Sequence, residues 1–264
     1  MNLKPLIYNK INFDSPEAVE KAYNVLRNKK CLRDIYTEQY QMMYKLCKKY
    51  LFDNSLNKIL EIGSGGGFIK DIYPDVIASD IGKKGNIDVL IDAEWLPFKS
   101  NSLNAIFGVH VIHHIPNISN FLKEADRVLK NGGVIICIEP YWGPLATFIY
   151  KNMHPEPFDK KALSWNLEEC ADKKQMIRSN QALSYLLLKR DKDEFKRIFP
   201  QLELIYQKPF GFIRYFFTGG VWLERKLPDF CFPIFEVFEE IISPLMFIFG
   251  LHHVFVLRKN MLSV

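Results

Sequence analysis

A short apolar run that stops at three glycines constrains the fold of this chain more than any other feature. The run Lys58-Ile59-Leu60-Glu61-Ile62 is followed at once by Gly63, Gly65 and Gly67. Continuous apolar runs of this length are typical of buried strands in parallel sheets. Glycine has no Cβ, so the backbone can turn sharply there and a ligand can lie against its amides. The sequence therefore predicts a buried strand that ends in a ligand-binding turn.

Similar apolar runs recur at regular spacing after these glycines. The predicted strands lie at 76–80, 87–92, 105–110, 134–139, 201–206 and 254–258. A helix from Ile118 to Leu129 ends at the stop signal Asn131-Gly132-Gly133, and residues 141–199 read as helices and loops. Strands that alternate with helices predict an α/β fold, with a doubly wound, mostly parallel, Rossmann-like seven-stranded sheet. We expect N-terminal helices before it and a helical cover inserted after the fifth strand.

Composition and charge exclude several classes of protein. The formal charge of +5 is mild and no basic stripe is visible, so no nucleic-acid partner is expected. The five cysteines are widely spaced and never form a CxxC pair, which argues against a zinc or disulfide framework. The N-terminus carries no apolar signal-peptide core. These features predict a cytoplasmic protein.

The apolar stretch from Phe230 to Leu257 tests that prediction. It contains Glu236, Glu239 and Glu240, and its longest charge-free part, Ile241 to Leu257, is shorter than the ~20 residues of a membrane-spanning helix. A buried helix followed by a core strand is the favoured interpretation. Peripheral contact of this aromatic-rich segment with a membrane or a lipid stays open as an alternative, so the protein could also be membrane-associated.

Spacing around the glycines narrows the ligand. A dinucleotide fingerprint needs a glycine where Phe68 stands, and no Lys-Ser/Thr pair follows as in a triphosphate P-loop. Asp80 ends the second predicted strand seventeen residues after Gly63, where a carboxylate can accept both hydroxyls of a ribose. Asp92 ends the third strand and could accept the exocyclic amine of an adenine. These residues together describe a site for a nucleoside that is not a dinucleotide.

The stretch from about Lys58 to Pro140 resembles the cofactor-binding core of class I S-adenosylmethionine (SAM)-dependent methyltransferases, in particular the methyltransferase type 11 group. The matching segments are Leu60–Gly67, Asp80, Asp92–Phe98, Val111–Ile115 and Glu124–Gly133. Two segments depart from the family pattern. Leu103-Asn104 stands where the family usually has Phe-Asp, and Lys130-Asn131-Gly132-Gly133 stands where it has Lys-Pro-Gly-Gly. Neither departure touches the cofactor in that pattern.

The resemblance implies SAM as the cofactor and assigns a role to each matching position. The three glycines would line its methionine part, with Glu61 holding the turn and the ammonium group. Asp80 would bind the ribose hydroxyls, and Asp92 with the backbone of Ala93 would hold the adenine. The backbone near His110 would contact the amino-acid end. The expected cofactor residues are Glu61, Gly63, Ser64, Gly65, Gly67, Asp80, Ile81, Asp92, Ala93, Glu94 and His110.

Catalysis is expected to require no metal, because the sulfonium of SAM is already an activated leaving group. None of the six histidines is spaced as an obvious ligand set, and adjacent His113 and His114 would point different ways on a helix or strand. If the acceptor needs a base, we expect His114 or His154 to supply it as the catalytic residue. His114 follows the fourth strand, and His154 lies two residues before Glu156.

We expect a single methyltransferase domain over 1–264. Its parts are an N-terminal helical lid (1–52), the SAM-binding core (53–140), a helical acceptor cover (141–200), and terminal strands with an aromatic-rich helical insertion (201–264). The lid would begin with the helix start Asp14-Ser15-Pro16-Glu17 and continue in a helix from about Leu32 to Lys49. It would shield the donor from water with Tyr36 or Tyr40.

The acceptor is expected to be a small molecule. Met153–Asp159 and Phe217–Val221 resemble methyltransferases encoded with bacterial surface-polysaccharide pathways, which favours a sugar or sugar nucleotide. The apolar character of the C-terminal half favours a lipid-linked or polyprenyl-linked acceptor instead. A nucleic-acid methyltransferase and a non-catalytic SAM-binding protein stay open as alternatives, and the sequence does not indicate an oligomeric state.

Overall fold

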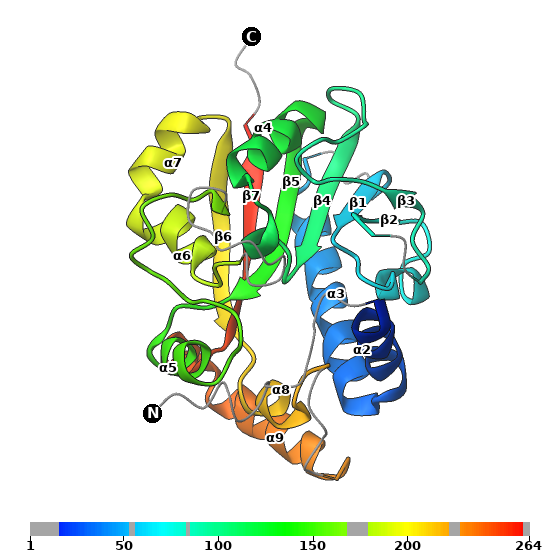
Figure 1. Cartoon of the computed structure of the whole chain (residues 1–264), viewed down its shortest axis with the longest axis vertical. Coiled ribbons are helices and arrows are strands. Elements are labelled where there is room, and N and C mark those ends of the chain that lie inside the picture. The colour runs from blue at the N-terminus through cyan, green and yellow to red at the C-terminus, as the bar shows by residue number, and fades with distance from the viewer. Residues whose placement is uncertain (1–15, 53–55, 83–84, 168–178, 222–227, 261–264) are drawn as a thin grey trace.

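A seven-stranded sheet forms the centre of the computed structural model, which describes residues 16–52, 56–82, 85–167, 179–221 and 228–260 (Figure 1). Across the sheet the strands are β3 (Val89–Leu90), β2 (Ile77–Asp80), β1 (Ile59–Ile62), β4 (Leu103–Val109), β5 (Leu129–Pro140), β7 (His252–Lys259) and β6 (Leu202–Phe210). The first five pair in parallel, and β7 runs antiparallel to both β5 and β6. The predicted α/β class and mostly parallel sheet are confirmed, with one antiparallel strand among the described residues.

Several predicted boundaries are wrong, among them the end of the strand predicted at 201–206, which runs to Phe210. The helix α4 (Ile118–Val128) passes directly into β5, so the glycines expected to stop the helix lie inside the strand. Leu129 is buried and pairs with Leu103 of β4, and this pairing extends the strand toward the helix. The third strand is shorter than the predicted 87–92, because only Val89 and Leu90 pair with β2.

Helices cover both faces of the sheet. The described helices are α2 (Pro16–Asn28), α3 (Lys30–Tyr50), α4, α5 (Pro144–Asn152), α6 (Leu183–Tyr185), α7 (Lys192–Ile198), α8 (Ile213–Thr218), α9 (Cys231–Ile241) and α10 (Met246–Phe249), with 3-10 turns η1 (Phe68–Asp71), η2 (Ile112–His114) and η5 (Ser243–Leu245) and a π turn η4 (Leu186–Arg190). On one face α3 buries Tyr40, Met43 and Cys47, which lie at helical spacing, against β1, β4 and β7. On the other face α4, η4 and α7 pack on the same strands.

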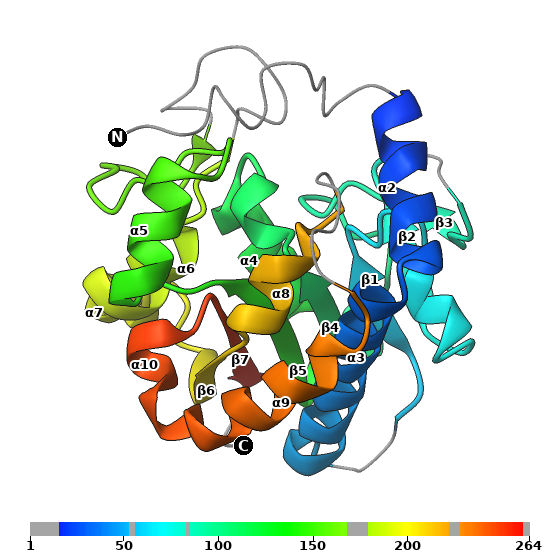
Figure 2. The same ribbon diagram turned by 90° about the horizontal axis from the view of Figure 1, so that it is seen from below.

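The parallel strands β1, β2, β4 and β5 end at the same edge of the sheet, here called the carboxyl edge. The helices α8 and α9 lie across it, as Figure 2 shows from below. Arg214 of α8 joins three helices there: its guanidinium contacts Glu38 of α3 at 2.8 and 2.9 Å and Glu239 of α9 at 3.0 Å. The N-terminal helices and the late insertion therefore meet above the strands that bear the predicted cofactor residues.

The apolar stretch near the C-terminus divides into two parts. Its strand, β7, is buried as predicted. Its helix, α9, is not: of its residues only Phe232 and Glu239 are buried, whereas Ile234 and Ile241 are 65% and 71% exposed. The prediction of a buried helix is thus wrong for α9. No helix within the described ranges has the length and apolar character needed to cross a membrane.

The buried side chains of the central strand β4 should contribute strongly to the free energy of unfolding. Phe107 on β4 is fully buried, so Phe107→Ala should lower the free energy of unfolding by about 3–5 kcal/mol through lost burial and a cavity. Phe148 on α5 is 60% exposed, and Phe148→Ala should change it by less than about 0.5 kcal/mol. Urea unfolding followed by circular dichroism measures both. Similar losses in the two variants would contradict the assigned core.

Candidate functional site

The glycine turn after β1 adopts the backbone conformation that the sequence predicts. Gly63, Gly65 and Gly67 all have positive φ, at 60°, 56° and 72°. A Cβ at Gly63 would lie 2.2 Å from the Val111 side chain, and one at Gly67 would lie 2.0 Å from the carbonyl oxygen of Asn86. A Cβ at Gly65 would meet nothing within 4 Å. The turn is therefore packed on both sides and open at its centre, where a ligand can approach the backbone.

Asp80, at the end of β2, faces the open part of this turn. Its Oδ2 accepts a hydrogen bond from the amide of Gly65 at 2.8 Å, and its Oδ1 accepts one from the amide of Gly82 at 3.0 Å. An ionised carboxylate has about four acceptor positions, so two hydroxyl donors can still be bound. The neighbouring Ile81 is 77% exposed, which leaves an apolar surface beside the carboxylate. This arrangement suits the ribose of a nucleoside.

Two serines tie the glycine turn to β2. The Ser64 amide donates to the Ser79 carbonyl at 2.8 Å, and the Ser79 amide donates to the Ser64 hydroxyl at 3.1 Å. The Ser79 hydroxyl in turn donates to the Glu61 carbonyl at 2.7 Å. The Ser64 side chain, predicted to contact the cofactor, is thus buried against β2, and its part is to hold the turn.

Asp92 and Glu94 follow β3 at the same edge. Asp92 is exposed, and its Oδ1 accepts a hydrogen bond from the Glu94 amide at 2.9 Å. Glu94 Oε1 accepts one from the Asn117 amide at 2.9 Å and so links this loop to the start of α4. Ala93 is half-buried and packs against the core. Asp92 thus keeps acceptor positions open to solvent, whereas the Glu94 side chain is partly used within the protein.

Glu61 is the buried acid of the site. Its side chain is only 1% exposed, and the Tyr40 hydroxyl of α3 donates to its Oε1 at 2.6 Å. Burial raises the pKa of Glu61 to about 7, against the opposing hydrogen bonds from Ser64 and Tyr40. Its Oε2 has no hydrogen-bond partner among the described residues. A buried, unpaired carboxylate oxygen beneath the turn fits a ligand ammonium group.

The N-terminal helix α2 covers part of the glycine turn. A Cβ at Gly66 would lie 1.6 Å from the ring of Tyr23, so this ring rests directly on the turn. Of the two tyrosines predicted to shield the donor, Tyr40 reaches Glu61, and Tyr36 is hydrogen-bonded to Tyr215 of α8. Tyr23 was not predicted, because no local pattern in α2 marks its one aromatic residue as a contact of the glycine turn.

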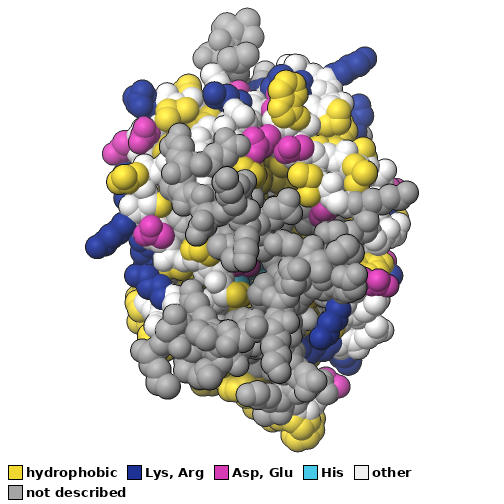
Figure 3. Space-filling view, viewed as in Figure 1, with side chains coloured by type: hydrophobic (Ala, Val, Ile, Leu, Met, Phe, Trp, Pro, Cys, Tyr) yellow, Lys and Arg dark blue, Asp and Glu magenta, His cyan; other side chains and the backbone are white. Residues whose placement is uncertain are grey.

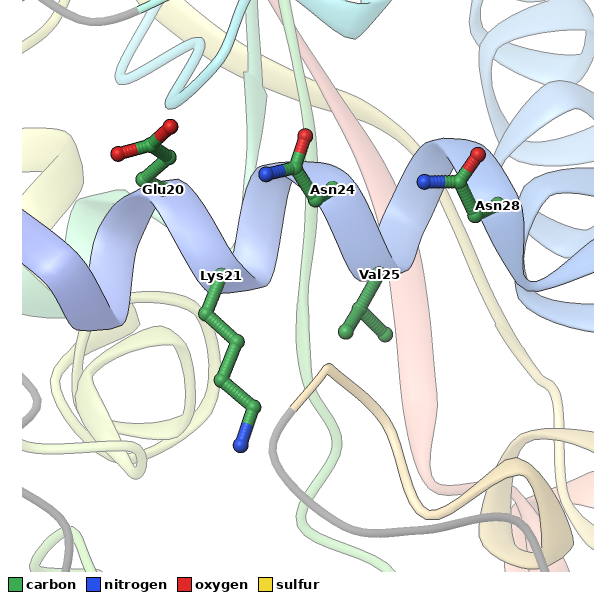
Figure 4. A pocket seen from close by; sticks show the side chains of 5 residues that line it. All are labelled: Glu20, Lys21, Asn24, Val25 and Asn28. Carbon is green, nitrogen blue, oxygen red and sulfur yellow. The ribbon is translucent and has the colours of Figure 1, made fainter.

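A hollow of about 440 Å³ lies against α2, but it is not the cofactor site. Figure 4 shows its lining, Glu20, Lys21, Asn24, Val25 and Asn28, all from this one helix. The side chains of Lys21 and Val25 project to one side of the helix and the others to the opposite side. No residue of the glycine turn lines this hollow, and Asp80 and Asp92 lie outside it.

His110 directly follows β4, next to the glycine turn. It has a positive φ of 53°, and its amide donates to the Ile138 carbonyl at 2.8 Å. Burial lowers the pKa of its imidazole to about 4, so the ring is neutral at physiological pH. Its ring centroid lies 4.7 Å from that of His252. Nε2 of His110 and Nδ1 of His252 are buried and have no hydrogen-bond partner among the described residues.

His113 lies between two carboxylates. Its Nδ1 pairs with Oε2 of Glu139, and its Nε2 lies 3.2 Å from Oε2 of Glu156. Burial lowers its pKa, but the two carboxylates outweigh that effect and raise it to about 10. Glu139 also accepts the amides of Val111 and Ile112 at 2.9 Å each. The carboxylate of Glu139 thus holds the whole turn after β4.

The two predicted catalytic histidines both lie close to Glu156. His114 Nε2 is 3.7 Å from Glu156 Oε2, and Gln181 Nε2 bridges His154 Nδ1 at 2.7 Å and Glu156 Oε2 at 3.0 Å. The expectation that His113 and His114 point apart is wrong. They lie in the 3-10 turn η2, and their ring centroids are 4.2 Å apart. Burial lowers the pKa of His114 to about 4.

All six histidines of the chain interact around the carboxyl edge. The negative charges of Glu139 and Glu156 act to raise the pKa of His110, His113 and His114. His154 acts to lower the pKa of His110 and His252. Both ring nitrogens of His253 form hydrogen bonds. Nε2 lies 2.9 Å from the Ser184 hydroxyl, and Nδ1 lies 3.0 Å from Nε2 of Gln207. Sequence reasoning missed the members on β7, since they lie more than a hundred residues after β4 and only the sheet pairing brings them close.

The residues at the glycine turn fit SAM. Glu61 Oε2 has no hydrogen-bond partner among the described residues and can therefore accept an ammonium group. Gly65 leaves room for a ligand against the backbone, and Asp80 has free acceptor positions for the ribose hydroxyls. Asp92 is exposed at the adjoining strand end, where an adenine would follow the ribose. These features lie in one row along the ends of β1, β2 and β3.

Comparison with known proteins agrees with this geometry. Residues 60–137 match the family described as "Methyltransferase domain". The chain is 46% identical over 61 residues to the ubiquinone/menaquinone biosynthesis C-methyltransferase UbiE of Brucella canis, and 30% identical over 116 residues to the mitochondrial 2-methoxy-6-polyprenyl-1,4-benzoquinol methylase of Mus musculus. These matches cover 22% and 40% of this chain, and 23% and 33% of those proteins. The chain thus matches less than half of the length of either relative.

The fold is also that of a solved methyltransferase. A SAM-dependent methyltransferase from Archaeoglobus fulgidus superposes with a TM-score of 0.51 at 14% identity, over 86% of this chain and 94% of that one. Residues 60–137 thus match a methyltransferase domain, and the chain has the fold of a SAM-dependent methyltransferase. Within that domain lie the glycine turn, Asp80, Asp92 and the histidine turn after β4.

The methyltransferase domain should bind SAM through Asp80. Asp80→Ala leaves the ribose hydroxyls unpaired and should weaken SAM binding by about 1–3 kcal/mol in titration calorimetry. Asp75 is exposed in the turn before β2, and Asp75→Ala serves as the control that keeps wild-type affinity. Binding of NAD without binding of SAM by the wild-type protein would contradict the assignment.

The raised pKa of Glu61 predicts a pH dependence. The carboxylate attracts the SAM ammonium only when it has lost its proton, and its pKa is about 7 in the free protein. SAM affinity should therefore increase as the pH is raised from about 6 to about 8, because Glu61 loses its proton over this range. Glu61→Gln keeps the shape of the side chain and should remove this dependence. A pH profile that is the same in both proteins would show that Glu61 does not contact the ammonium.

Proposed function

We propose that this chain transfers the methyl group of SAM to a small-molecule acceptor at the carboxyl edge of the sheet. The observation that carries the proposal is the open glycine turn at Gly65, flanked by the Asp80 carboxylate and by the unpaired oxygen of Glu61. When bound, SAM supplies a methyl group on an activated sulfonium. The protein has to align the acceptor with that group and exclude water.

The chain's own residues divide this work. Glu61 and Asp80 hold the amino-acid end and the ribose of the donor, and Val111, packed on Gly63, fixes the turn between them. Tyr23 and Tyr40 bring α2 and α3 against the turn and shield it from solvent. The acceptor then approaches from the histidine side of the edge, beyond His110.

The histidine side combines aromatic surfaces with unpaired polar atoms. Trp142 packs edge-on against both Tyr185 and His253, and Tyr215 packs edge-on against His252. The free nitrogens of His110 and His252 can each form one hydrogen bond to a ligand. Aromatic faces beside neutral hydrogen-bonding groups suit a sugar or a sugar nucleotide. This supports the acceptor class that the resemblance of Met153–Asp159 and Phe217–Val221 suggests.

A lipid-linked acceptor is the second candidate, and α9 is the observation that favours it. Its outer face presents exposed apolar side chains at Ile234, Val237, Phe238 and Ile241. Such a face can lie in a membrane interface and bring the carboxyl edge close to a lipid. The names of the quinone methyltransferase relatives agree with an apolar acceptor. Peripheral membrane contact through α9 belongs to this second proposal.

Surface charge is compatible with a small acceptor. On the face seen in Figure 3, the described Lys and Arg side chains lie scattered among Asp and Glu. Nucleic-acid binding depends on rows of positive groups along the phosphates. The absence of a nucleic-acid partner remains a prediction.

Transfer of label separates the two acceptor classes. Methyl-labelled SAM, incubated with the protein and a whole-cell metabolite extract, should yield a labelled small molecule. Label in the aqueous phase supports a sugar or sugar nucleotide, and label in the organic phase supports a lipid-linked acceptor. An Asp80→Ala protein run in parallel should transfer far less label at limiting SAM. Absence of any labelled product, with SAM bound, would favour a non-catalytic SAM-binding protein.

With the acceptor identified, His114 and His154 can be tested as the base. Replacing the true base with Gln should lower turnover by about 10²–10⁴-fold and leave SAM affinity nearly unchanged. Because burial lowers the pKa of His114 to about 4, that ring is neutral throughout pH 6 to 9, but the same low pKa makes it a weak base. Turnover at the wild-type rate in both single variants and in the double variant would show that alignment alone carries the reaction.

A further inference from the structure

Three potential metal ligands converge beside the carboxyl edge. His113 and His114 come from η2, and Glu156 comes from the loop after α5. Glu156 Oε2 lies 3.2 Å from His113 Nε2 and 3.7 Å from His114 Nε2, and all three donor atoms lie within 4.8 Å of one another. Donors bound to one first-row cation at ~2.0–2.2 Å are separated by similar distances.

The surroundings orient these donors as in a metal site. Glu139 pairs with Nδ1 of His113, so it is Nε2 that faces Glu156. Histidines bound to metals usually direct their other nitrogen to a carboxylate in this way. Gln181 donates to Glu156 Oε2 at 3.0 Å and holds that carboxylate in place. Glu139 is itself fixed by the amides of Val111 and Ile112.

We propose that His113 Nε2, His114 Nε2 and Glu156 Oε2 form a binding site for a divalent first-row transition-metal cation. Two imidazoles and one carboxylate are a donor set that Zn²⁺ and Fe²⁺ both accept, and a bound cation takes the place of the proton between His113 Nε2 and Glu156. The site goes beyond the proposed methyl transfer, which requires no metal for donor binding. It departs from the sequence expectation that the histidines form no ligand set.

The site is incomplete with protein ligands alone. Three donors leave at least one coordination position of a cation open, which water or an oxygen of a ligand can fill. The His114 side chain is 27% exposed, so the cluster meets solvent on the His114 side, whereas His113 and Glu156 are nearly enclosed. An oxygen-bearing ligand bound there would lie at the edge where the acceptor is proposed to bind.

Metal retention provides the test. The full chain is treated with a chelator, dialysed against Zn²⁺ or, without oxygen, Fe²⁺, freed of loose metal and analysed by elemental mass spectrometry. About one equivalent should remain on the wild-type protein. His114→Gln and Glu156→Gln should each lose it, since both remove a donor at nearly constant shape. Gln181→Ala should weaken binding by about 10–100-fold through loss of the outer hydrogen bond.

His154→Gln is the matched control, because it changes a neighbouring histidine that is not one of the three donors. It should retain the metal, and X-ray absorption of the wild-type complex should show two imidazoles. Retention by His114→Gln and Glu156→Gln proteins, equal loss in His154→Gln, or no stoichiometric metal on the wild type would each overturn the proposal. Circular dichroism confirms that each variant is folded. SAM binding is measured separately, so failure of the metal site leaves the proposed methyl transfer intact.

Discussion

The carboxylate of Glu139, buried at the end of β5, is the interaction on which the site depends. One of its oxygens accepts the amides of Val111 and Ile112, and the other pairs with His113. A charge only 1% exposed is tolerated because each oxygen is compensated. Burial alone would raise its pKa, but the adjacent His113 holds the pKa of Glu139 below its usual range. Removing one member of such a buried pair typically costs about 3–5 kcal/mol.

The turn held by Glu139 connects the donor and acceptor sides. Val111 in that turn packs on Gly63, so the position of the glycine turn is set by the same carboxylate. His113 and His114 emerge from it toward Glu156, and His110 precedes it with a positive φ of 53°. One buried acid thus sets the relative positions of the cofactor turn and of the histidines proposed to meet the acceptor.

Local signals in the sequence were sufficient to place the residues that are predicted to bind the cofactor. The glycine turn, Asp80 and Asp92 each lie where a strand ends, and that order is visible in the apolar runs alone. The boundary between α4 and β5 was not predictable from Gly132 and Gly133, because pairing of Leu129 with β4 overrides their tendency to end a helix. The buried-helix prediction failed at α9 since the order of apolar residues does not reveal which face meets the core.

The acceptor side depends on contacts that are distant in sequence. His252 reaches His110 through the pairing of β7 with β5, and Glu156 reaches His113 across the loop after α5. The adjacent pair His113 and His114 converges only because the chain forms a 3-10 turn there. No spacing rule for helices or strands brings these groups together, so the ligand set was invisible in the sequence.

A crystal structure with S-adenosylhomocysteine tests the assignment of the site most directly. Both ribose hydroxyls should lie within hydrogen-bond distance of the Asp80 carboxylate, with the amino group near Glu61. The sulfur should face the histidine side of the carboxyl edge, next to His110. A ligand bound in the hollow against α2, or anywhere that leaves Asp80 and the glycine turn without contact, would contradict the account.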